Sequence, residues 1–267
     1  MPFAEYLLEW LDIVKVRVKA TTYSSYEAMV KSTLEPYFRN KGYTLQGLEA
    51  RHIQQFYTEK LKTVKPNSVI HYHAVIHQAL KYAMKTDLVP QNVAMKVDRP
   101  KKNDYQPVFL DADELKQLFD VIKGTRLELP VLVAAFYGLR RGEVCGLKWD
   151  AIDFERGTLT IKHTVTSVQV DGKTKMYAQD SAKTKSSMRT LPLVGSFAEY
   201  FKEVKAAQEL NKQVCGNCYN YEYDGFVFVD ELGERMRVEY LTNAFPKFLE
   251  SHGLRRMRFH DLRPSCA

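Results

Sequence analysis

Cysteine is scarce in this sequence, and no hydrophobic run is long enough to cross a bilayer. Four cysteines, at positions 145, 215, 218 and 266, are too few for a disulfide scaffold in a chain of 267 residues, which favours a reducing compartment. The apolar stretch at 130–137 is far shorter than a membrane span and runs directly into arginines. We therefore expect a cytoplasmic protein without a membrane partner.

Residues that ligate metals are also sparse. Cys215 and Cys218 have the spacing of half a zinc site or of a redox motif, but no second Cys or His pair follows at ligand spacing. We interpret the pair as structural or incidental, with a small metal module as the weaker alternative. No metal site is expected.

Acidic residues are fewer than basic ones. The 32 Asp and Glu face 39 Lys and Arg, for a formal net charge of +7. This balance favours nucleic acid or another polyanion as partner, although a surplus of this size is common and does not establish one. A hydrophobic content of 45% is enough for a sizeable core, and the length favours two modest domains.

The first part of the chain is typical of a helical domain. Apolar side chains recur at spacings of three and four residues in four segments. These segments are about 3–18, 22–38, 48–61 and 67–86. Short polar connections separate them, so we predict a compact four-helix domain over residues 1–97.

A polar and basic segment, 98–108, follows this domain and is bracketed by prolines. We predict that it is a linker. Two interpretations of Arg99, Lys101 and Lys102 stay open. They are solvated side chains of a plain connection, which the composition favours, or they contact DNA phosphates as the linker passes along DNA.

Residues 109–267 combine helical and strand patterns. Helices are predicted at about 111–122, 127–137, 195–212 and 238–252, and strands near 158–165, 173–177, 189–193 and 226–229. Asp171-Gly172 is suited to a type I′ hairpin turn. The sequence therefore predicts a mainly α fold with a small antiparallel sheet, of the α+β class.

Two basic motifs lie near the two ends of this second half. Gly138 ends an apolar helix and leads into Leu-Arg-Arg-Gly-Glu at 139–143, and His-Asp-Leu-Arg occupies 260–263. Arg140 falls in the first turn of a predicted short helix, where backbone N–H groups favour an anion. Planar guanidinium groups at Arg140 and Arg263 are suited to hold a phosphodiester without a metal.

Three further residues of these motifs are candidates for the same site. Glu143 can hold Arg140 through an i,i+3 ion pair and has a supporting role, although such pairs are usually surface contacts. Two interpretations of Arg141 stay open: its side chain contacts backbone phosphate, or it is solvated. His260 and Arg263 share a face of a starting helix, so His260 can accept or relay a nucleophile's proton; an ordinary packed or exposed histidine is the alternative.

Three segments, in order, resemble motifs of the tyrosine recombinase (phage integrase) family. Residues 135–149, Ala-Phe-Tyr-Gly-Leu-Arg-Arg-Gly-Glu-Val-Cys-Gly-Leu-Lys-Trp, resemble its first arginine motif. Residues 259–263, Phe-His-Asp-Leu-Arg, resemble its His-x-x-Arg motif. Between them, 183–193, Lys-Thr-Lys-Ser-Ser-Met-Arg-Thr-Leu-Pro-Leu, resemble its β-hairpin lysine segment. The helical first half resembles the family's core-binding, SAM-like domain, so the likeness covers nearly the whole chain.

The resemblance implies a metal-free and cofactor-free DNA strand transferase of a bacterial mobile element. In this family a tyrosine attacks the scissile phosphate and forms a 3′-phosphotyrosine. Arg140 and Arg263 would hold the phosphate, and a hairpin lysine would protonate the leaving 5′ oxygen. We choose Lys183 for this acid, with Lys185 as the alternative or as a phosphate contact. The implied partner is double-stranded DNA at a recombination site, with self-association on DNA, as a tetramer in the complete family enzyme.

The end of the sequence departs from the family pattern. The family's nucleophilic tyrosine lies several tens of residues beyond His-x-x-Arg, and only Pro264 to Ala267 follow here. None of the 16 tyrosines occupies the matching position, so we assign no nucleophile. We expect the catalytic domain, 109–267, to be incomplete and the chain to bind DNA without completing strand transfer. The alternative is a non-catalytic DNA-binding protein that occupies recombination sites.

Overall fold

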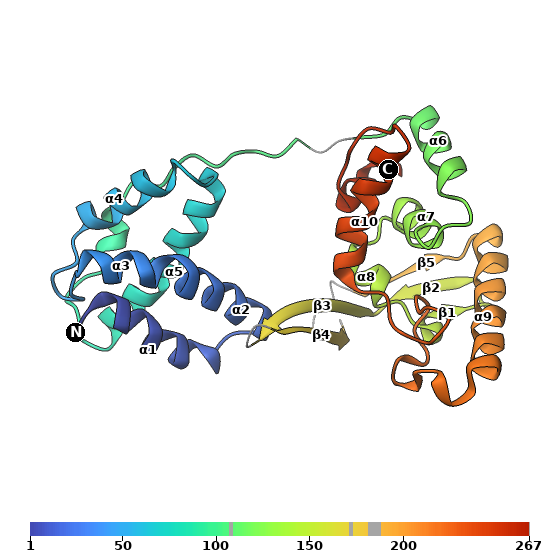
Figure 1. Cartoon of the computed structure of the whole chain (residues 1–267), viewed down its shortest axis with the longest axis horizontal. Coiled ribbons are helices and arrows are strands. Elements are labelled where there is room, and N and C mark those ends of the chain that lie inside the picture. The colour runs from blue at the N-terminus through green and yellow to red at the C-terminus, as the bar shows by residue number, and fades with distance from the viewer. Residues whose placement is uncertain (107–108, 171–172, 181–187, 267) are drawn as a thin grey trace. The chain divides into compact units, whose positions relative to one another are not determined.

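The computed structural model describes residues 1–106, 109–170, 173–180 and 188–266. These residues form two compact units (Figure 1): unit 1 consists of 1–106 with 168–170, and unit 2 of the remainder. Helices dominate and the strands form two small sheets, which confirms the predicted mainly α class. Within the described residues, no helix combines the length and apolar character that a membrane span requires.

Unit 1 is helical. Its α-helices are α1 (Phe3–Lys15), α2 (Ala20–Met29), α3 (Glu35–Lys41), α4 (Ala50–Lys60) and α5 (Pro66–Lys85), with η1 (Val30–Leu34) and η2 (Val93–Lys96) as a π-helical and a 3₁₀ segment. The single helix predicted at 22–38 is thus three consecutive segments. Apolar faces of these helices enclose one core, and the Tyr6 hydroxyl donates to the Ala79 carbonyl at 2.7 Å, which joins α1 to α5.

The segment that follows η2 is fixed to the start of α5. The Asn67 side chain donates to the Asn103 carbonyl at 3.1 Å and accepts from the Asn103 N–H at 3.0 Å. Residues 98–106 form neither helix nor strand. This two-point contact therefore sets the course of an otherwise irregular segment. The domain boundaries proposed at 97 and 108 stay predictions.

Unit 2 combines helices with a three-stranded sheet. Its helices are α6 (Ala112–Ile122), α7 (Glu128–Tyr137), α8 (Arg141–Cys145), α9 (Gly195–Cys215) and α10 (Val238–Ser251), with 3₁₀ segments η3 (Trp149–Ala151), η5 (Gly216–Cys218), η6 (Tyr221–Tyr223) and η7 (Phe259–Cys266). Strands β1 (Ile152–Asp153), β2 (Thr158–Ile161) and β5 (Arg189–Pro192) pair antiparallel in the order β1-β2-β5. Strands β3 (His163–Val170) and β4 (Lys173–Asp180) form a second, two-stranded sheet; the turn predicted at Asp171-Gly172 lies outside the described residues.

One predicted strand, at 226–229, is wrong. Only isolated bridges occur there, from Phe226 to Lys148 and from Val229 to Arg235. The two bridges have different partners, so no ladder of consecutive pairs develops. The apolar run is instead part of the core, where Val227 is 1% exposed.

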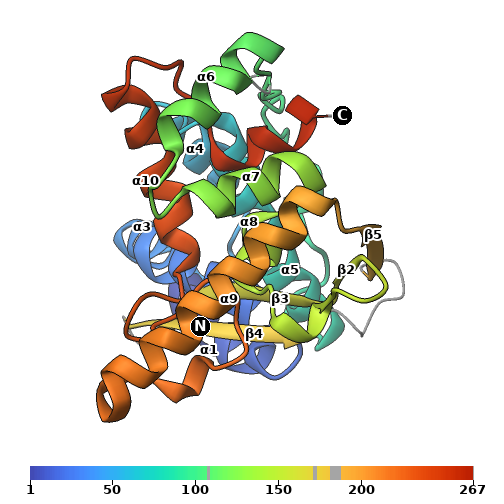
Figure 2. The ribbon, with the colours of Figure 1, turned by 90° about the vertical axis from the view of Figure 1, so that its right-hand side faces the viewer.

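Helix α7 lies at the centre of unit 2. Val131, Val133 and Ala134 on it are fully buried, because other elements cover several of its sides. Figure 2 shows η7, at the red end of the chain, running alongside α7. Segments far apart in the sequence, 128–137 and 259–266, therefore lie side by side.

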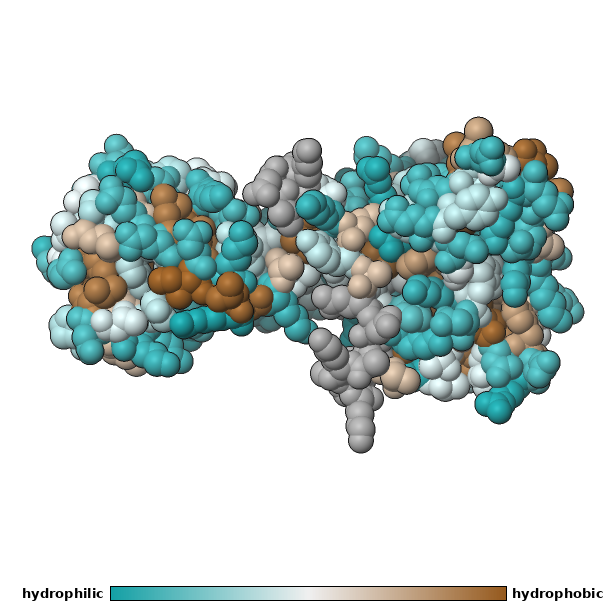
Figure 3. Space-filling view, turned by 90° about the horizontal axis from the view of Figure 1, so that it is seen from below, coloured by the Kyte–Doolittle hydropathy of each residue, from teal (hydrophilic) through white to brown (hydrophobic). Residues whose placement is uncertain are grey.

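Figure 3 shows the molecule from below. The surface seen there is mostly hydrophilic and carries several hydrophobic patches.

Candidate functional site

The end of α7 sets the direction of Arg140. Gly138 has a φ of 61°, in the left-handed region that glycine adopts without strain, and it ends the helix as predicted. Leu139 is buried and anchors the turn. Arg140 then adopts an extended backbone and is the residue preceding α8, one position earlier than the predicted first turn. Its side chain is 57% exposed and available to a ligand.

Helix α8 packs closely against β3 through two glycines. A Cβ atom on Gly142 would lie 2.6 Å from the Val165 carbonyl oxygen, and one on Gly146 would lie 2.9 Å from the His163 carbonyl oxygen. Both distances are too short for a carbon atom. The backbone of α8 therefore approaches β3 as only glycine allows, and the intervening Glu143 is directed into the protein.

Glu143 is a buried carboxylate that joins two arginines. Arg140 donates to it from its backbone N–H and from Nη1, each at 2.8 Å. Arg189 donates from Nη1 at 3.2 Å and from Nη2 at 2.8 Å. Burial alone raises the pKa of Glu143, but the hydrogen bonds from Arg189 and Arg140 outweigh it and lower this pKa below its usual range. The expected i,i+3 pair is present, and its carboxylate is only 6% exposed.

Arg189 was not among the site residues predicted from the sequence. It begins β5 and pairs with Ile161 of β2, a contact between segments far apart in the chain. The signal that could have found it is the Arg-x-x-Pro-Leu pattern at the end of the lysine segment, where Arg189 stands three residues before Pro192. Its bidentate contact with Glu143 shows that this arginine belongs to the cluster.

Arg263 joins the cluster from η7. Its Nε donates to the Gly138 carbonyl at 2.7 Å, which ties η7 to the end of α7. Burial, the charge of Arg140 and the charge of Arg189 lower the pKa of Arg263, while Glu143 opposes them. Three guanidinium groups thus interact around one carboxylate. The resulting excess of positive charge is suited to an anion such as a phosphodiester.

The geometry of η7 differs from the prediction, because it is a 3₁₀ helix rather than the start of an α-helix. The buried Asp261 accepts from the Arg258 N–H at 3.1 Å and from Arg258 Nη2 at 2.9 Å, which fixes the first turn. A proline can end a helix, but η7 continues past Pro264 to Cys266. Residues three apart are eclipsed in a 3₁₀ helix, so His260 and Arg263 share a face by backbone geometry.

His260 lies among arginines. Partial burial, followed by the charges of Arg141, Arg258 and Arg263, lowers the pKa of His260, and Asp261 opposes this shift. The imidazole is therefore neutral near pH 7, the form that accepts a proton.

Replacing Arg141 by Gln is expected to raise the pKa of His260, because Arg141 is the strongest of the charges that lower it. The measurement is a pH titration of the His260 Cε1–H signal by NMR. Arg156→Gln is the matched control, since Arg156 is 86% exposed and its charge is not among those acting on His260. An unchanged His260 titration in Arg141→Gln would contradict the prediction.

The remaining predicted site residues have other partners, belong to unit 1 or are not described. Lys183 and Lys185 lie outside the described residues. The Arg141 guanidinium donates to Thr242 Oγ1 on α10 at 2.6 Å. Arg99, Lys101 and Lys102 belong to unit 1. Their contacts with phosphate stay predictions.

Metal-ligating groups do not gather among the described residues. No cluster of three His, Cys, Asp or Glu suited to a metal ion occurs there. Cys215 and Cys218 are free thiols, and the Cys215 thiol donates to the Glu231 carbonyl at 3.4 Å. The Cys-x-x-Cys pair thus has no third or fourth ligand in the part of the chain that the structure describes.

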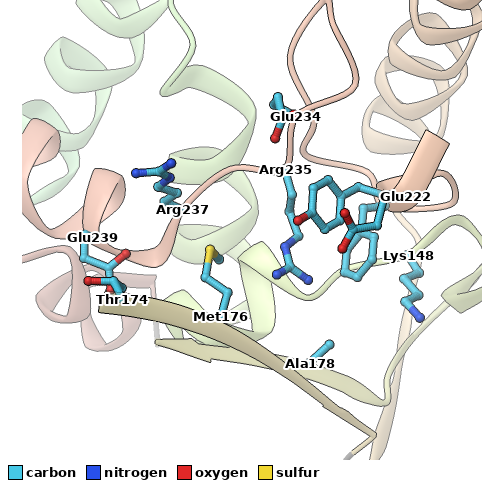
Figure 4. Close-up of a pocket in the computed structure, with 11 residues that line it drawn as sticks. Lys148, Thr174, Met176, Ala178, Glu222, Glu234, Arg235, Arg237 and Glu239 are labelled. Carbon is cyan, nitrogen blue, oxygen red and sulfur yellow. The ribbon is translucent and has the colours of Figure 1, made fainter. Parts of the chain in front are cut away.

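A separate cavity of about 570 Å³ lies between β4 and the segment 222–239. Figure 4 shows the Arg235 guanidinium pointing toward β4, and this group stacks on the Tyr223 and Phe226 rings. The basic lining residues are Lys148, Arg235 and Arg237, and three glutamates, Glu222, Glu234 and Glu239, line the same cavity. Acidic groups in such number oppose a polyanion, so we do not include this cavity in the phosphate site.

Comparison with known proteins agrees with this architecture. The model of the phage integrase family matches residues 108–267, and that of the phage integrase N-terminal SAM-like domain matches residues 2–61. A protein named tyrosine recombinase XerC-like, from Caldanaerobacter subterraneus subsp. tengcongensis, is 27% identical over 277 residues, covering 97% of this chain and 69% of that protein.

Solved structures of low sequence identity share the fold. The Tn1549 transposon integrase in complex with a circular intermediate DNA superimposes with a TM-score of 0.80 at 16% identity, covering 100% of this chain and 85% of that one. A lambda integrase tetramer bound to a Holliday junction gives a TM-score of 0.70 at 17% identity, covering 100% of this chain and 69% of that one. The fold is therefore that of DNA integrases. The chain belongs to the phage integrase family, which confirms the assignment made from the three motifs.

Proposed function

We propose that this chain serves site-specific DNA recombination by binding double-stranded DNA and holding the scissile phosphodiester between Arg140 and Arg263. The observation that carries the proposal is the buried Glu143 carboxylate, which fixes Arg140 through two hydrogen bonds and is itself held by Arg189. Ordered guanidinium groups stabilise the charge that develops on phosphate oxygens during transfer, without a metal.

The remaining roles follow the chemistry of the family. His260 accepts or relays the proton of the attacking hydroxyl, which fits its lowered pKa. Lys183, or alternatively Lys185, protonates the leaving 5′ oxygen. Arg99, Lys101, Lys102 and Arg141 contact backbone phosphates and add affinity without reading sequence. We assign no nucleophile among the 267 residues, so the proposal for this chain is DNA binding and phosphate positioning, without strand transfer by these residues alone.

We further propose that the chain acts in the bacterial cytoplasm and self-associates on its DNA site. Support comes from the bacterial relative and from the lambda integrase, which is a tetramer on a Holliday junction. The fold shared with DNA-bound integrases is compatible with such an assembly.

Binding of a fluorescent duplex tests the proposal. Arg140→Ala and Arg263→Ala are each expected to lower affinity roughly tenfold or more, because each removes a charge-assisted contact to phosphate. Arg156→Ala is the control, because Arg156 is an exposed arginine that pairs with Asp153 and has no proposed contact with the phosphate. Equal affinity in all four proteins would refute the assigned phosphate contacts.

A suicide substrate tests the absence of a nucleophile. A nicked duplex traps any covalent protein–DNA adduct, and the 267-residue chain is expected to form none while it still binds the duplex. An adduct would show that one of the present tyrosines, or another side chain, attacks phosphate.

A further inference from the structure

A second cavity, of about 440 Å³, lies in unit 1 beside α5. His73 and His77 contribute to it from one face of that helix, and Arg99 contributes from the segment after η2. Its other lining residues are Ala74, Gln78, Ala94, Met95 and Val97. Among these lining residues there is no carboxylate, in contrast to the cavity beside β4. A cavity that carries a guanidinium and two imidazoles without an acid is suited to an anion.

The two imidazoles are stacked and held in place. Their ring centroids lie 5.8 Å apart with an interplanar angle of 28°. His73 Nδ1 lies 2.7 Å from the Tyr57 hydroxyl on α4. In the neutral ring the phenol donates to Nδ1 or accepts from it, depending on the tautomer. In the protonated ring both nitrogens are donors, so Nδ1 donates to the Tyr57 oxygen and Nε2 can donate to a ligand.

Burial and the positive charge around His73 oppose its protonation in the free protein. Burial, then Arg99, then His77 lower the pKa of His73 to about 4. The groups that face His73 are thus Tyr57 from α4, Arg99 from the segment after η2, and His77 from α5 itself. The carboxylate next in sequence, Asp98, lines an adjoining cavity that also contains Arg99.

The segment that carries Arg99 is ordered before any ligand binds. The two hydrogen bonds between Asn67 and Asn103 fix it to the first turn of α5. Gln54 of α4 also accepts from the Asp98 backbone N–H at 3.1 Å. A ligand of this cavity therefore meets a preorganised guanidinium, which reduces the entropic cost of binding.

We propose that the cavity formed by His73, His77 and Arg99 binds a phosphate of the DNA backbone, and that this binding places a proton on the histidine pair. The proposal rests on the proposed DNA-binding function. A phosphate neutralises the charge of Arg99 and accepts a hydrogen bond from an imidazolium, so it removes the main charge that opposes protonation. A ligand that prefers the protonated form is bound more tightly as the pH falls, with uptake of a proton.

Duplex binding measured against pH at constant ionic strength tests this proposal. As the pH falls from about 7.5 toward the free-state pKa of His73, about 4, the affinity of the unmodified chain is expected to rise by up to roughly tenfold per pH unit for each proton taken up. His73→Gln and His77→Gln retain polar side chains but cannot titrate, so each is expected to flatten this dependence. Arg99→Gln is expected to weaken binding at every pH and to reduce its salt dependence.

Two other histidines serve as comparisons. His252 bonds to the Phe248 carbonyl outside the cavity, so His252→Gln is expected to leave the pH dependence unchanged. His260 belongs to the candidate phosphate site. A pH dependence that survives in His73→Gln and His77→Gln, or that disappears only in His260→Gln, would overturn the proposal. Failure of the unmodified chain to bind DNA at any pH would instead overturn the proposed function, and this inference with it.

NMR titration of the imidazole signals distinguishes DNA phosphate from free phosphate. The duplex is expected to raise the pKa of His73, whereas inorganic phosphate at the same phosphate concentration is expected to leave it nearly unchanged, because a single weak anion lacks the other contacts of the duplex. A rise with inorganic phosphate but not with duplex would show that the cavity takes the free ion and that the assignment to DNA is wrong.

Discussion

Replacing Glu143 by Gln is expected to lower the free energy of unfolding by about 2–3 kcal/mol. The carboxylate is 6% exposed and accepts hydrogen bonds from Arg140 and Arg189, so its neutralisation leaves two guanidinium groups facing each other without a counter-charge. Loss of one partner of a fully buried ion pair costs about 3–5 kcal/mol. The smaller figure applies here because the Arg140 side chain is 57% exposed and regains water.

Chemical denaturation of the two proteins measures this loss. Glu250→Gln is the matched control, since Glu250 pairs with Arg256 at 2.7 Å on the surface, where both side chains are about half exposed or more. Its removal is expected to cost less than about 1 kcal/mol. If the two variants lose equal stability, Glu143 is not the centre of the arginine cluster.

The stability difference between the unmodified chain and Glu143→Gln also has a defined pH dependence. The folded state lowers the pKa of Glu143, so its carboxylate stays ionised to a lower pH than in the unfolded chain. The stabilisation is therefore complete above the ordinary pKa of a glutamate, about 4.3, and is lost as the pH falls through the lowered value. The difference should shrink in acid and not in mild base.

Local sequence signals were sufficient for much of the site. The apolar run of α7, its glycine stop and the i,i+3 spacing of Arg140 and Glu143 depend on neighbouring residues, and each occurs in the structure. The burial of Glu143 was not predictable in this way. It requires α8 to contact β3 through Gly142, and a contact between segments that are separated in sequence leaves no periodic pattern in either one.

The missed Arg189 has the same cause. It reaches Glu143 only because β5 pairs with β2 in the register that places Arg189 opposite Ile161. The two strands β3 and β4 separate β2 from β5 in the sequence, so pattern alone does not indicate that β2 and β5 are neighbours. The wrong strand at 226–229 is the converse case, in which a short continuous apolar run reflects burial in the core without a continuous partner strand.

Replacing Gly142 by Ala is expected to destabilise the chain by at least about 2 kcal/mol, because overpacking against fixed backbone is costly. The added Cβ would lie 2.6 Å from the Val165 carbonyl oxygen and 3.1 Å from a Thr164 methyl group. The carbonyl is backbone of β3 and cannot rotate away, so α8 must move outward. That movement displaces Arg140 and Glu143 together, and guanidinium placement within about 0.5 Å matters for phosphate binding. Duplex affinity should therefore fall with stability.

Gly195→Ala separates this steric effect from the general consequence of adding a methyl group. Gly195 begins α9, and a Cβ there meets no atom within 4 Å. Alanine is the better helix former by up to about 1 kcal/mol, so this variant should be as stable as the unmodified chain or slightly more so, with unchanged affinity for DNA. Thermal unfolding and duplex binding of both variants give the comparison. A Gly142→Ala protein that melts and binds like Gly195→Ala would mean that α8 tolerates a side chain against β3, and the close contact would then not be what positions Arg140.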